Sequence, residues 1–285
     1  MLSIATDFLE LTGESKISSK ATKTGDGGAV FIDAEKVLLN DGSEIETLTE
    51  YIMPPEQGQE GILAGRGGAL FLNAKELTIS DGSGMELGTS GTGNSGAAMI
   101  SSDKVTLTGW SYINGDVKPS EVDDFESYND KWRLVTGNGS DIVFESMEMT
   151  VNGESKIDIT SAGTGNAGSL SITTESLKIA DFSSISSTAS KTGNAGSIEI
   201  TANNILLNNY SEIETFTRFI PDKGKQIGNT AGTGGDLVLD VKTLTITGNS
   251  GMELGTWGQG DSGSATIRSD EVILEGSYIN GDVYG

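Results

Sequence analysis

Six glutamates recur at matching places in two copies of a repeated pattern, and their carboxylates could hold a cation or a basic partner. They are Glu44, Glu46 and Glu86, with the copies Glu212, Glu214 and Glu253. Carboxylates stacked roughly 5 Å apart raise one another's pKa or recruit a cation. Calcium suits such oxygen ligands, so we expect any cofactor to be calcium, at Glu46, Glu86, Glu214 and Glu253. The alternative is a solvated acidic face that only maintains solubility.

A second candidate site is an acidic, aromatic segment at residues 118–139, KPSEVDDFESYNDKWRLVTGNG. Aromatic rings flanked by polar groups can stack on sugars, and recognition residues often lie on loops that project from a rigid scaffold. The candidates for recognition are Asp123, Asp124, Tyr128 and Trp132. The alternative is that the aromatic residues only hold this segment against the rest of the chain.

Composition closes most familiar catalytic routes. The chain has no cysteine and no histidine, which excludes thiol nucleophiles, histidine-based triads and the usual zinc sites. Its formal net charge of −23 disfavours nucleic acid and anionic lipid as partners. No apolar run could span a bilayer, and the first residues do not form a signal peptide, so we expect no membrane insertion and place any export signal outside this sequence.

An apolar pattern recurs along the chain at a regular step. The glycine of GSL and its equivalents occupy positions 28, 68, 96, 140 (a serine), 168, 196, 235 and 263, so the steps are 40, 28, 44, 28, 28, 39 and 28. The base step is therefore 28, and the three long steps carry insertions at about residues 48–67, 118–139 and 216–234. All four prolines fall inside these insertions, which supports the alignment because proline interrupts strand pairing.

Pairs of apolar residues spaced by two predict three short strands in each unit. A unit cannot bury its own inner face, but stacked units align each position into an inward column. One such column is Ile17, Ile45, Met85, Ile113, Ile157, Ile185, Ile213, Met252 and Ile279. We therefore predict an all-β, single-stranded parallel β-helix, right-handed by the usual crossover preference, with about nine rungs in one continuous domain over residues 1–285.

A longer repeat lies over the short one. SEIET, SGMELGT and SYINGDV each occur twice, and the two occurrences are offset in the numbering by 168, 167 and 166, respectively. The chain thus contains a first block at residues 1–167 and a partial second block at 168–285. We expect a segment of a longer repetitive shaft, or rods that stack end to end.

The unit GNAGSLSITTESLKIADFSSISSTASKTGNAG resembles the shaft repeats of filamentous-haemagglutinin-like exoproteins, which Gram-negative bacteria export by two-partner secretion. The resemblance covers the chain except for its insertions. It implies a secreted or cell-surface protein, an outer-membrane secretion partner, and adhesion to a glycan, to matrix or to other cells. The secretion domain of that family is not visible in this sequence.

The function predicted from these observations is an extracellular structural and adhesive rod without enzymatic activity. Assembly of neighbouring copies into a filament or surface layer is the alternative. A polysaccharide-degrading or polysaccharide-binding β-helix is less favoured, because Arg66, Arg133, Arg218 and Arg268 are scattered and the densest carboxylate cluster occurs only once.

Overall fold

The described part of the chain is all β-structure. The computed structural model describes residues 1–22, 25–50, 65–90, 92–118, 136–190, 192–218 and 231–284, and these form strands and no helix. None of these residues therefore forms a helix with the length and hydrophobicity needed to cross a lipid bilayer. The candidates Asp123, Asp124, Tyr128 and Trp132 lie outside the described residues.

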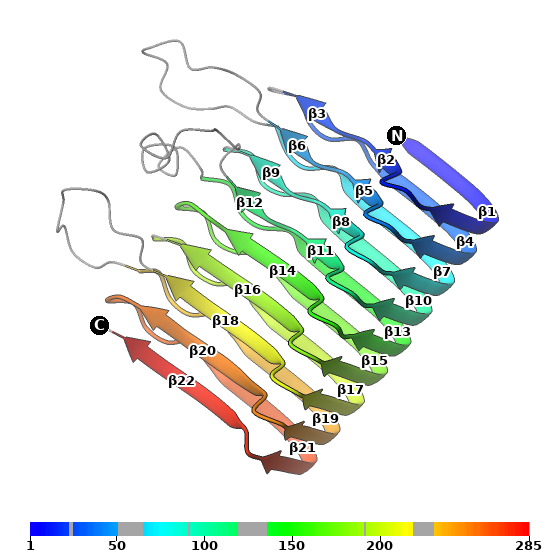
Figure 1. Cartoon of the computed structure of the whole chain (residues 1–285). Coiled ribbons are helices and arrows are strands. Elements are labelled where there is room, and N and C mark those ends of the chain that lie inside the picture. Colours follow the sequence, from blue (N-terminus) through cyan, green and yellow to red (C-terminus); the bar gives the residue numbers. More distant parts are fainter. Residues whose placement is uncertain are drawn as a thin grey trace, which may run out of the picture.

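Nine long parallel strands form the first sheet, each paired with the next one along the stack (Figure 1). They are β1 (Leu2–Leu11), β4 (Val30–Leu39), β7 (Ala69–Ile79), β10 (Ala97–Leu107), β13 (Asp141–Val151), β15 (Leu170–Ala180), β17 (Ile198–Asn208), β19 (Leu237–Thr247) and β21 (Ala265–Glu275).

A second parallel sheet faces the first and is built from shorter strands. One series comprises β2 (Lys16–Ser18), β5 (Glu44–Glu46), β8 (Gly84–Glu86), β11 (Tyr112–Asn114), β14 (Lys156–Ser161), β16 (Ser184–Ser190), β18 (Glu212–Arg218), β20 (Gly251–Trp257) and β22 (Tyr278–Tyr284). Four two-residue strands continue it at one end of the stack: β3 (Ala21–Thr22), β6 (Thr49–Glu50), β9 (Thr89–Ser90) and β12 (Val117–Lys118). Stacked parallel sheets of this kind fit a β-helix.

The strands pair in register whatever the length of chain between them. Leu170 pairs with Ile198 across a short step of the repeat, whereas Ile198 pairs with Leu237 across a long step that contains an insertion. The extra residues of the longer step are accommodated outside the paired segments, so the inward pattern is not displaced.

The prediction of three separate strands per unit was wrong in one respect. The first two predicted strands are a single bent strand in each long element. In β4 the buried residues are Val30, Ile32 and Ala34, and then Val37 and Leu39. The alternation of inward-facing residues thus shifts by one position at the bend, and the strand continues through the bend without a turn.

The core lies between the two sheets as one continuous cluster from Leu11 to Leu254. The column predicted through Ile45 is found in the pairing of the short strands, where Ile45 pairs with Met85 and Met85 with Ile113. Each of these three residues is fully buried. Burial of one such side chain contributes roughly 1.5–3 kcal/mol, so stacking supplies stabilisation that a lone unit lacks.

Asparagine and serine side chains connect consecutive layers. The Asn138 Oδ1 atom accepts a hydrogen bond of 2.9 Å from the Asn166 amide, and the Asn166 Oδ1 atom accepts one of 3.0 Å from the Asn194 amide. Buried Ser183 and Ser211 repeat this contact through a hydroxyl. These contacts explain why Asn and Ser persist in the repeat.

The glycine at the register mark is needed for close approach of two backbones. A Cβ atom added to Gly196 would lie 1.6 Å from the carbonyl oxygen of Gly168 in the preceding layer. Its role is therefore steric, and it differs from the turn-forming role that glycine-rich segments usually indicate.

Candidate functional site

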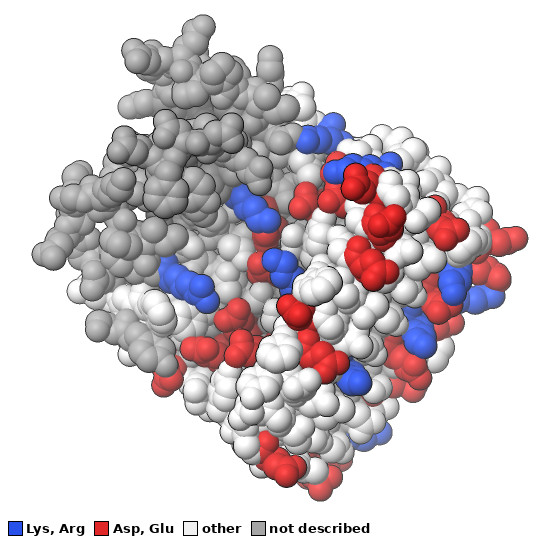
Figure 2. Space-filling view, in the orientation of Figure 1, with Lys and Arg blue, Asp and Glu red and all other residues white. Residues whose placement is uncertain are grey.

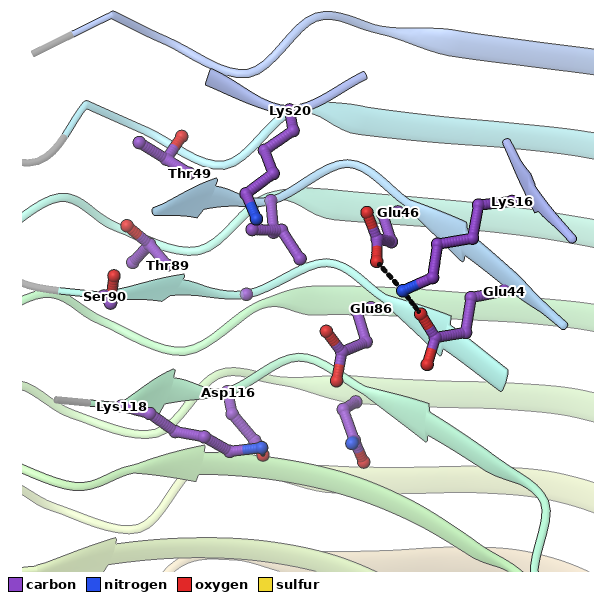
Figure 3. A pocket seen from close by; sticks show the side chains of 13 residues that line it. Lys16, Lys20, Glu44, Glu46, Thr49, Glu86, Thr89, Ser90, Asp116 and Lys118 are labelled. Atoms are coloured by element: carbon purple, nitrogen blue, oxygen red, sulfur yellow. Dashed lines mark hydrogen bonds and ion pairs between the residues drawn. The ribbon is translucent and has the colours of Figure 1, made fainter. Parts of the chain in front are cut away.

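A groove with a volume of about 560 Å³ opens over β5, β8 and β11 and the short strands that follow them (Figure 3). It is lined by Lys16, Lys20, Glu44, Glu46, Leu48, Thr49, Glu86, Gly88, Thr89, Ser90, Asn114, Asp116 and Lys118. Three of the six predicted glutamates thus line one groove. The lining includes acidic and basic groups side by side, in agreement with the mixed charge on this face of the molecule (Figure 2).

Lys16 connects the first two glutamates. Its Nζ atom lies 2.5 Å from Glu44 Oε2 and 2.9 Å from Glu46 Oε1. Hydrogen bonds to both carboxylates raise the pKa of Lys16. Burial opposes ionisation of Glu44, but hydrogen bonds from Lys16 and Tyr112 outweigh it and lower the pKa of Glu44. One edge of the groove is therefore a cluster in which one ammonium group serves two carboxylates, so the cluster keeps one negative charge.

Tyr112 reaches Glu44 across an intervening strand. Its hydroxyl donates a 2.6 Å hydrogen bond to Glu44 Oε1, although β8 lies between β11 and β5 in the sheet. The ring passes over Gly84, where an added Cβ atom would lie 2.4 Å from the ring. Glycine at position 84 therefore leaves the space that Tyr112 needs to reach Glu44.

Asp116 and Lys118 form the other edge. Asp116 Oδ2 lies 2.7 Å from Lys118 Nζ, and Asp116 Oδ1 accepts a hydrogen bond of 2.9 Å from the Thr160 amide. Burial raises the pKa of Asp116 to about 6. The residue is only 5% exposed.

Between these two edges lie Glu86 and Asn114, which are neighbours in the strand pairing. Burial raises the pKa of Glu86. Asn114 is 7% exposed, and its Oδ1 atom has no hydrogen-bond partner among the described residues. The centre of the groove thus holds hydrogen-bond acceptors without donors in the described part of the chain, whereas the charged groups at its two edges are paired with one another.

The second block repeats the arrangement. The Tyr278 hydroxyl donates a 2.5 Å hydrogen bond to Glu212 Oε1, and the ring passes over Gly251. Ser184 pairs with Glu212 where Lys16 pairs with Glu44 in the first block. Burial raises the pKa of Glu214 to about 7. No lysine neutralises this copy at that position, since serine replaces it.

Aromatic side chains border the second copy. The rings of Phe216 and Trp257 meet edge-to-face with centroids 6.0 Å apart, and the Arg218 guanidinium lies 5.7 Å from the centre of the Phe216 ring. Phe216 occupies the place of Leu48 in the first copy. The two copies therefore share their acidic residues and differ in the basic and apolar groups beside them.

The predicted glutamate column is present as paired residues. Glu46 pairs with Glu86, and Glu214 pairs with Glu253. Burial raises the pKa of Glu253, as it does that of Glu86. Within the residues that the structure describes, no group of three or more acidic side chains is arranged to hold a metal ion. Calcium at Glu46, Glu86, Glu214 and Glu253 stays a prediction.

Sequence reasoning did not select the other half of the groove. The residues that line or complete it are Lys16, Tyr112, Asn114, Asp116 and Lys118, and none of them was among the predicted site residues. A signal was present, because the duplicated motif SYINGDV supplies the tyrosine, the asparagine and the aspartate together.

The lining of the groove is partly repeated in the second block. Eight of its thirteen residues match there. The matching residues are Glu44, Glu46, Thr49, Glu86, Gly88, Thr89, Asn114 and Asp116, and the differing ones are Lys16, Lys20, Leu48, Ser90 and Lys118. Gly84 and Tyr112, which complete the groove, also match.

Outward residues of the long strands differ between the same two blocks. Phe31 corresponds to Glu199, and Phe71 corresponds to Val238. The matching glycines have a steric role in folding, since a Cβ atom added to Gly84 or Gly88 would meet the Tyr112 ring or the Asp116 carbonyl oxygen. Glu86 and Asn114 have no such role, and their recurrence favours a constraint beyond folding.

No family model, no curated protein and no solved structure matches the chain. The interpretation of the groove depends on its own geometry.

Proposed function

We propose that the chain is a segment of an extracellular shaft that attaches to a ligand through its groove and catalyses no reaction. In this proposal the fold is a right-handed β-helix of nine rungs, with the base repeat found in the sequence. The protein is secreted or displayed at the surface of a Gram-negative bacterium through an outer-membrane partner. Its ligands are a glycan, a matrix component or another cell.

The observation that carries the proposal is the recurrence of the groove's acidic residues and Asn114 in the second block. Spacing alone does not require these outward side chains, because the inward columns hold the layers together. Two sets of the same acceptor residues on a rigid scaffold would bind a repetitive target at two points, and linked sites raise overall avidity well above the affinity of either site.

The protonation state of two groove lysines, Lys16 and Lys118, favours attachment over catalysis. A lysine that acts as a base needs a lowered pKa. Hydrogen bonds to Glu44 and Glu46 raise the pKa of Lys16. Burial alone would lower the pKa of Lys118, but Asp116 outweighs it and raises the pKa. Both ammonium groups are therefore held in the charged form, which suits binding.

The test is an attachment assay with purified protein on arrays of polysaccharides, matrix proteins and whole cells. The double variant Glu86→Gln with Glu253→Gln should lose attachment, and Glu199→Gln, which removes a charge from the long-strand face, should retain it. Equal attachment by wild type and both variants would contradict the proposal. Release of unsaturated or reducing sugar ends from any polysaccharide would favour the enzymatic alternative.

End-to-end assembly of copies is the second candidate. Val272, Ile273 and Leu274 in β21, the last strand of the long sheet, are 47%, 40% and 48% exposed. Contact between this strand and another copy would cover them. Sedimentation over a range of protein concentrations, with electron microscopy, would test this: filaments support assembly and a constant monomer mass refutes it.

A further inference from the structure

Two acceptors at the centre of the groove have no donor among the described residues. Asn114 Oδ1 is buried and unpartnered, and the Glu86 carboxylate has no hydrogen bond or ion pair within that part of the chain. Both side chains line the groove and belong to neighbouring strands. A buried acceptor without a donor is costly, so a ligand that supplies donors would be bound favourably.

The negative charge at the centre of the groove favours a cationic ligand. Lys16 is engaged by Glu44 and Glu46, and Lys118 is engaged by Asp116 (Figure 3). Lys20, the third lysine of the lining, also has an interaction of its own. Glu86 lies between the two clusters. Burial raises its pKa and outweighs the charges of Lys118 and Lys16, which lower it, so the charge of Glu86 is only partly compensated when it is ionised. A neutral sugar could donate hydrogen bonds but would leave that charge unbalanced.

The acceptor groups available in the groove indicate whether the cation is a metal ion or an ammonium group. Calcium takes six to eight oxygen ligands, and the described residues hold no cluster of three acidic side chains placed for a metal ion. An alkylammonium group has three donors. Glu86, Asn114 and the neighbouring Glu46 provide three acceptor side chains in one column. Lys16 already demonstrates, within the same groove, an ammonium held by two carboxylates at 2.5 and 2.9 Å.

We infer that the groove binds a primary alkylammonium group, as carried by a lysine side chain or a small polyamine, with Glu86 and Asn114 as its acceptors. This inference rests on the proposed binding role of the groove and names the ligand class. The alkyl stem lies toward Leu48, the apolar side chain among the groove residues. In the second copy Glu253 and Asn280 take the corresponding positions, although Asn280 is exposed. Phe216 replaces Leu48 and Ser184 replaces Lys16, and the nearby cation is Arg218, whose charge partly offsets the rise that burial causes in the pKa of Glu253.

Calorimetric titration of the whole chain tests the inference. The probes are 1,5-diaminopentane and Nα-acetyl-lysine N-methylamide, with Nα-acetyl-norleucine N-methylamide as the isostere that lacks the amine. We expect both amines to bind the wild-type protein and the norleucine compound not to bind. Glu86→Gln with Glu253→Gln should weaken binding by about tenfold or more, since the acceptor loses its charge in each copy and a charge-assisted hydrogen bond becomes a weaker neutral one. The control Glu199→Gln should bind like the wild type.

Nuclear magnetic resonance supplies a readout that does not depend on a variant. Titration with either amine should shift the side-chain amide signals of Asn114. If the lysine compound binds, a protein partner is indicated as the source. Binding of the diamine alone indicates a free polyamine, and both results support the inference.

Three results would overturn it: no amine binding at millimolar concentration, equal binding of the norleucine compound, or unchanged affinity in the double variant with a native melting curve. Its failure is distinguishable from failure of the proposed function. Loss of attachment in the double variant without amine binding would leave the groove functional and refute only the ligand class. Amine binding without any effect on attachment would refute the proposed function alone.

Discussion

At the residue scale, the groove depends on long side chains that reach past their nearest neighbours. Tyr112 bonds to Glu44 two strands away, and Lys16 bonds to two carboxylates at once. Because these contacts cross layers, a change in the residue beneath them alters groups on both sides.

Gly84→Ala should therefore destabilise the protein. The new Cβ atom would lie 2.4 Å from the Tyr112 ring, which would displace the ring and break its hydrogen bond to Glu44. We expect a loss of about 1–3 kcal/mol, measured by thermal or urea unfolding. Gly281→Ala is the matched control, because nothing lies within 4 Å of a Cβ atom added there. Equal melting temperatures for the two variants would refute this account.

Glu214→Gln should reduce the pH dependence of stability. Burial raises the pKa of Glu214 from its ordinary 4.5 to about 7, so the folded chain holds a proton that the unfolded chain releases in this range. The stability that this proton provides is present below pH 4.5 and is lost as the pH rises through 7. The loss is on the order of 3 kcal/mol.

Urea unfolding of wild type and variant near pH 4.5 and pH 8 measures this effect. Glutamine does not ionise, so the variant should gain stability relative to wild type as the pH rises. Glu199→Gln controls for removal of a charge. A constant difference between variant and wild type across this pH range would show that Glu214 is not a source of the pH dependence.

At the element scale, the layers are held by hydrogen bonds from side chain to backbone as well as by strand pairing. In the asparagine ladder, the Asn166 amide donates to the side chain of Asn138 in one neighbouring layer, and the Asn166 side chain accepts from the Asn194 amide in the other. Each link therefore fixes one layer against the next at the point where the chain leaves one strand for another.

Asn166→Ala should weaken the contact between its layer and the following one. The Asn194 amide would lose its acceptor, at a cost of about 1 kcal/mol, and its hydrogen exchange should accelerate. Asn166→Asp retains an acceptor oxygen and should preserve slow exchange at Asn194. Unchanged exchange in the alanine variant would show that the ladder does not hold the layers.

Prediction at this scale succeeded for register and was incomplete for strand limits. The inward columns follow from the spacing of apolar residues, so the pairing of Ile45 with Met85 could be predicted. The continuity of the long strands could not, because a one-residue shift of phase between Ala34 and Val37 looks like a break between two strands in an apolar pattern.

At the scale of the whole molecule, each layer contacts mainly its two neighbours. Stability in such stacks is close to a sum of terms for single layers and nearest-neighbour contacts. The first and last layers have one neighbour among the described residues, and β21 is exposed along most of its length.

Hydrogen exchange should therefore be slowest in the middle of the stack. We expect amides of β13, β15 and β17 to exchange most slowly, and those of β1, β21 and β22 to exchange fastest, because end layers open without breaking the centre. Mass spectrometry of exchanged peptides checks this gradient. Uniform exchange throughout would indicate one global opening, and protected ends would indicate that copies associate.

The sequence by itself determined the stacking and the composition of the glutamate column. Inward apolar residues spaced by two must coincide from layer to layer if a continuous core is to form, and the residues beside them then coincide as well. The duplicated motifs further placed Glu214 and Glu253 in the same relation as Glu46 and Glu86.

Only the tertiary structure decided which of these side chains have hydrogen-bond or ion-pair partners. Outward side chains are not constrained by core packing, and a lysine or tyrosine can reach one layer or two. The hydrogen bond between Glu44 and Tyr112, and the lack of a partner for Asn114 Oδ1 among the described residues, thus depend on distances and burial that residue spacing does not specify. The burial that raises the pKa of Glu86, Glu214 and Glu253 is set by the tertiary structure in the same way. Only the structure therefore shows that the acidic residues of the first block line a groove.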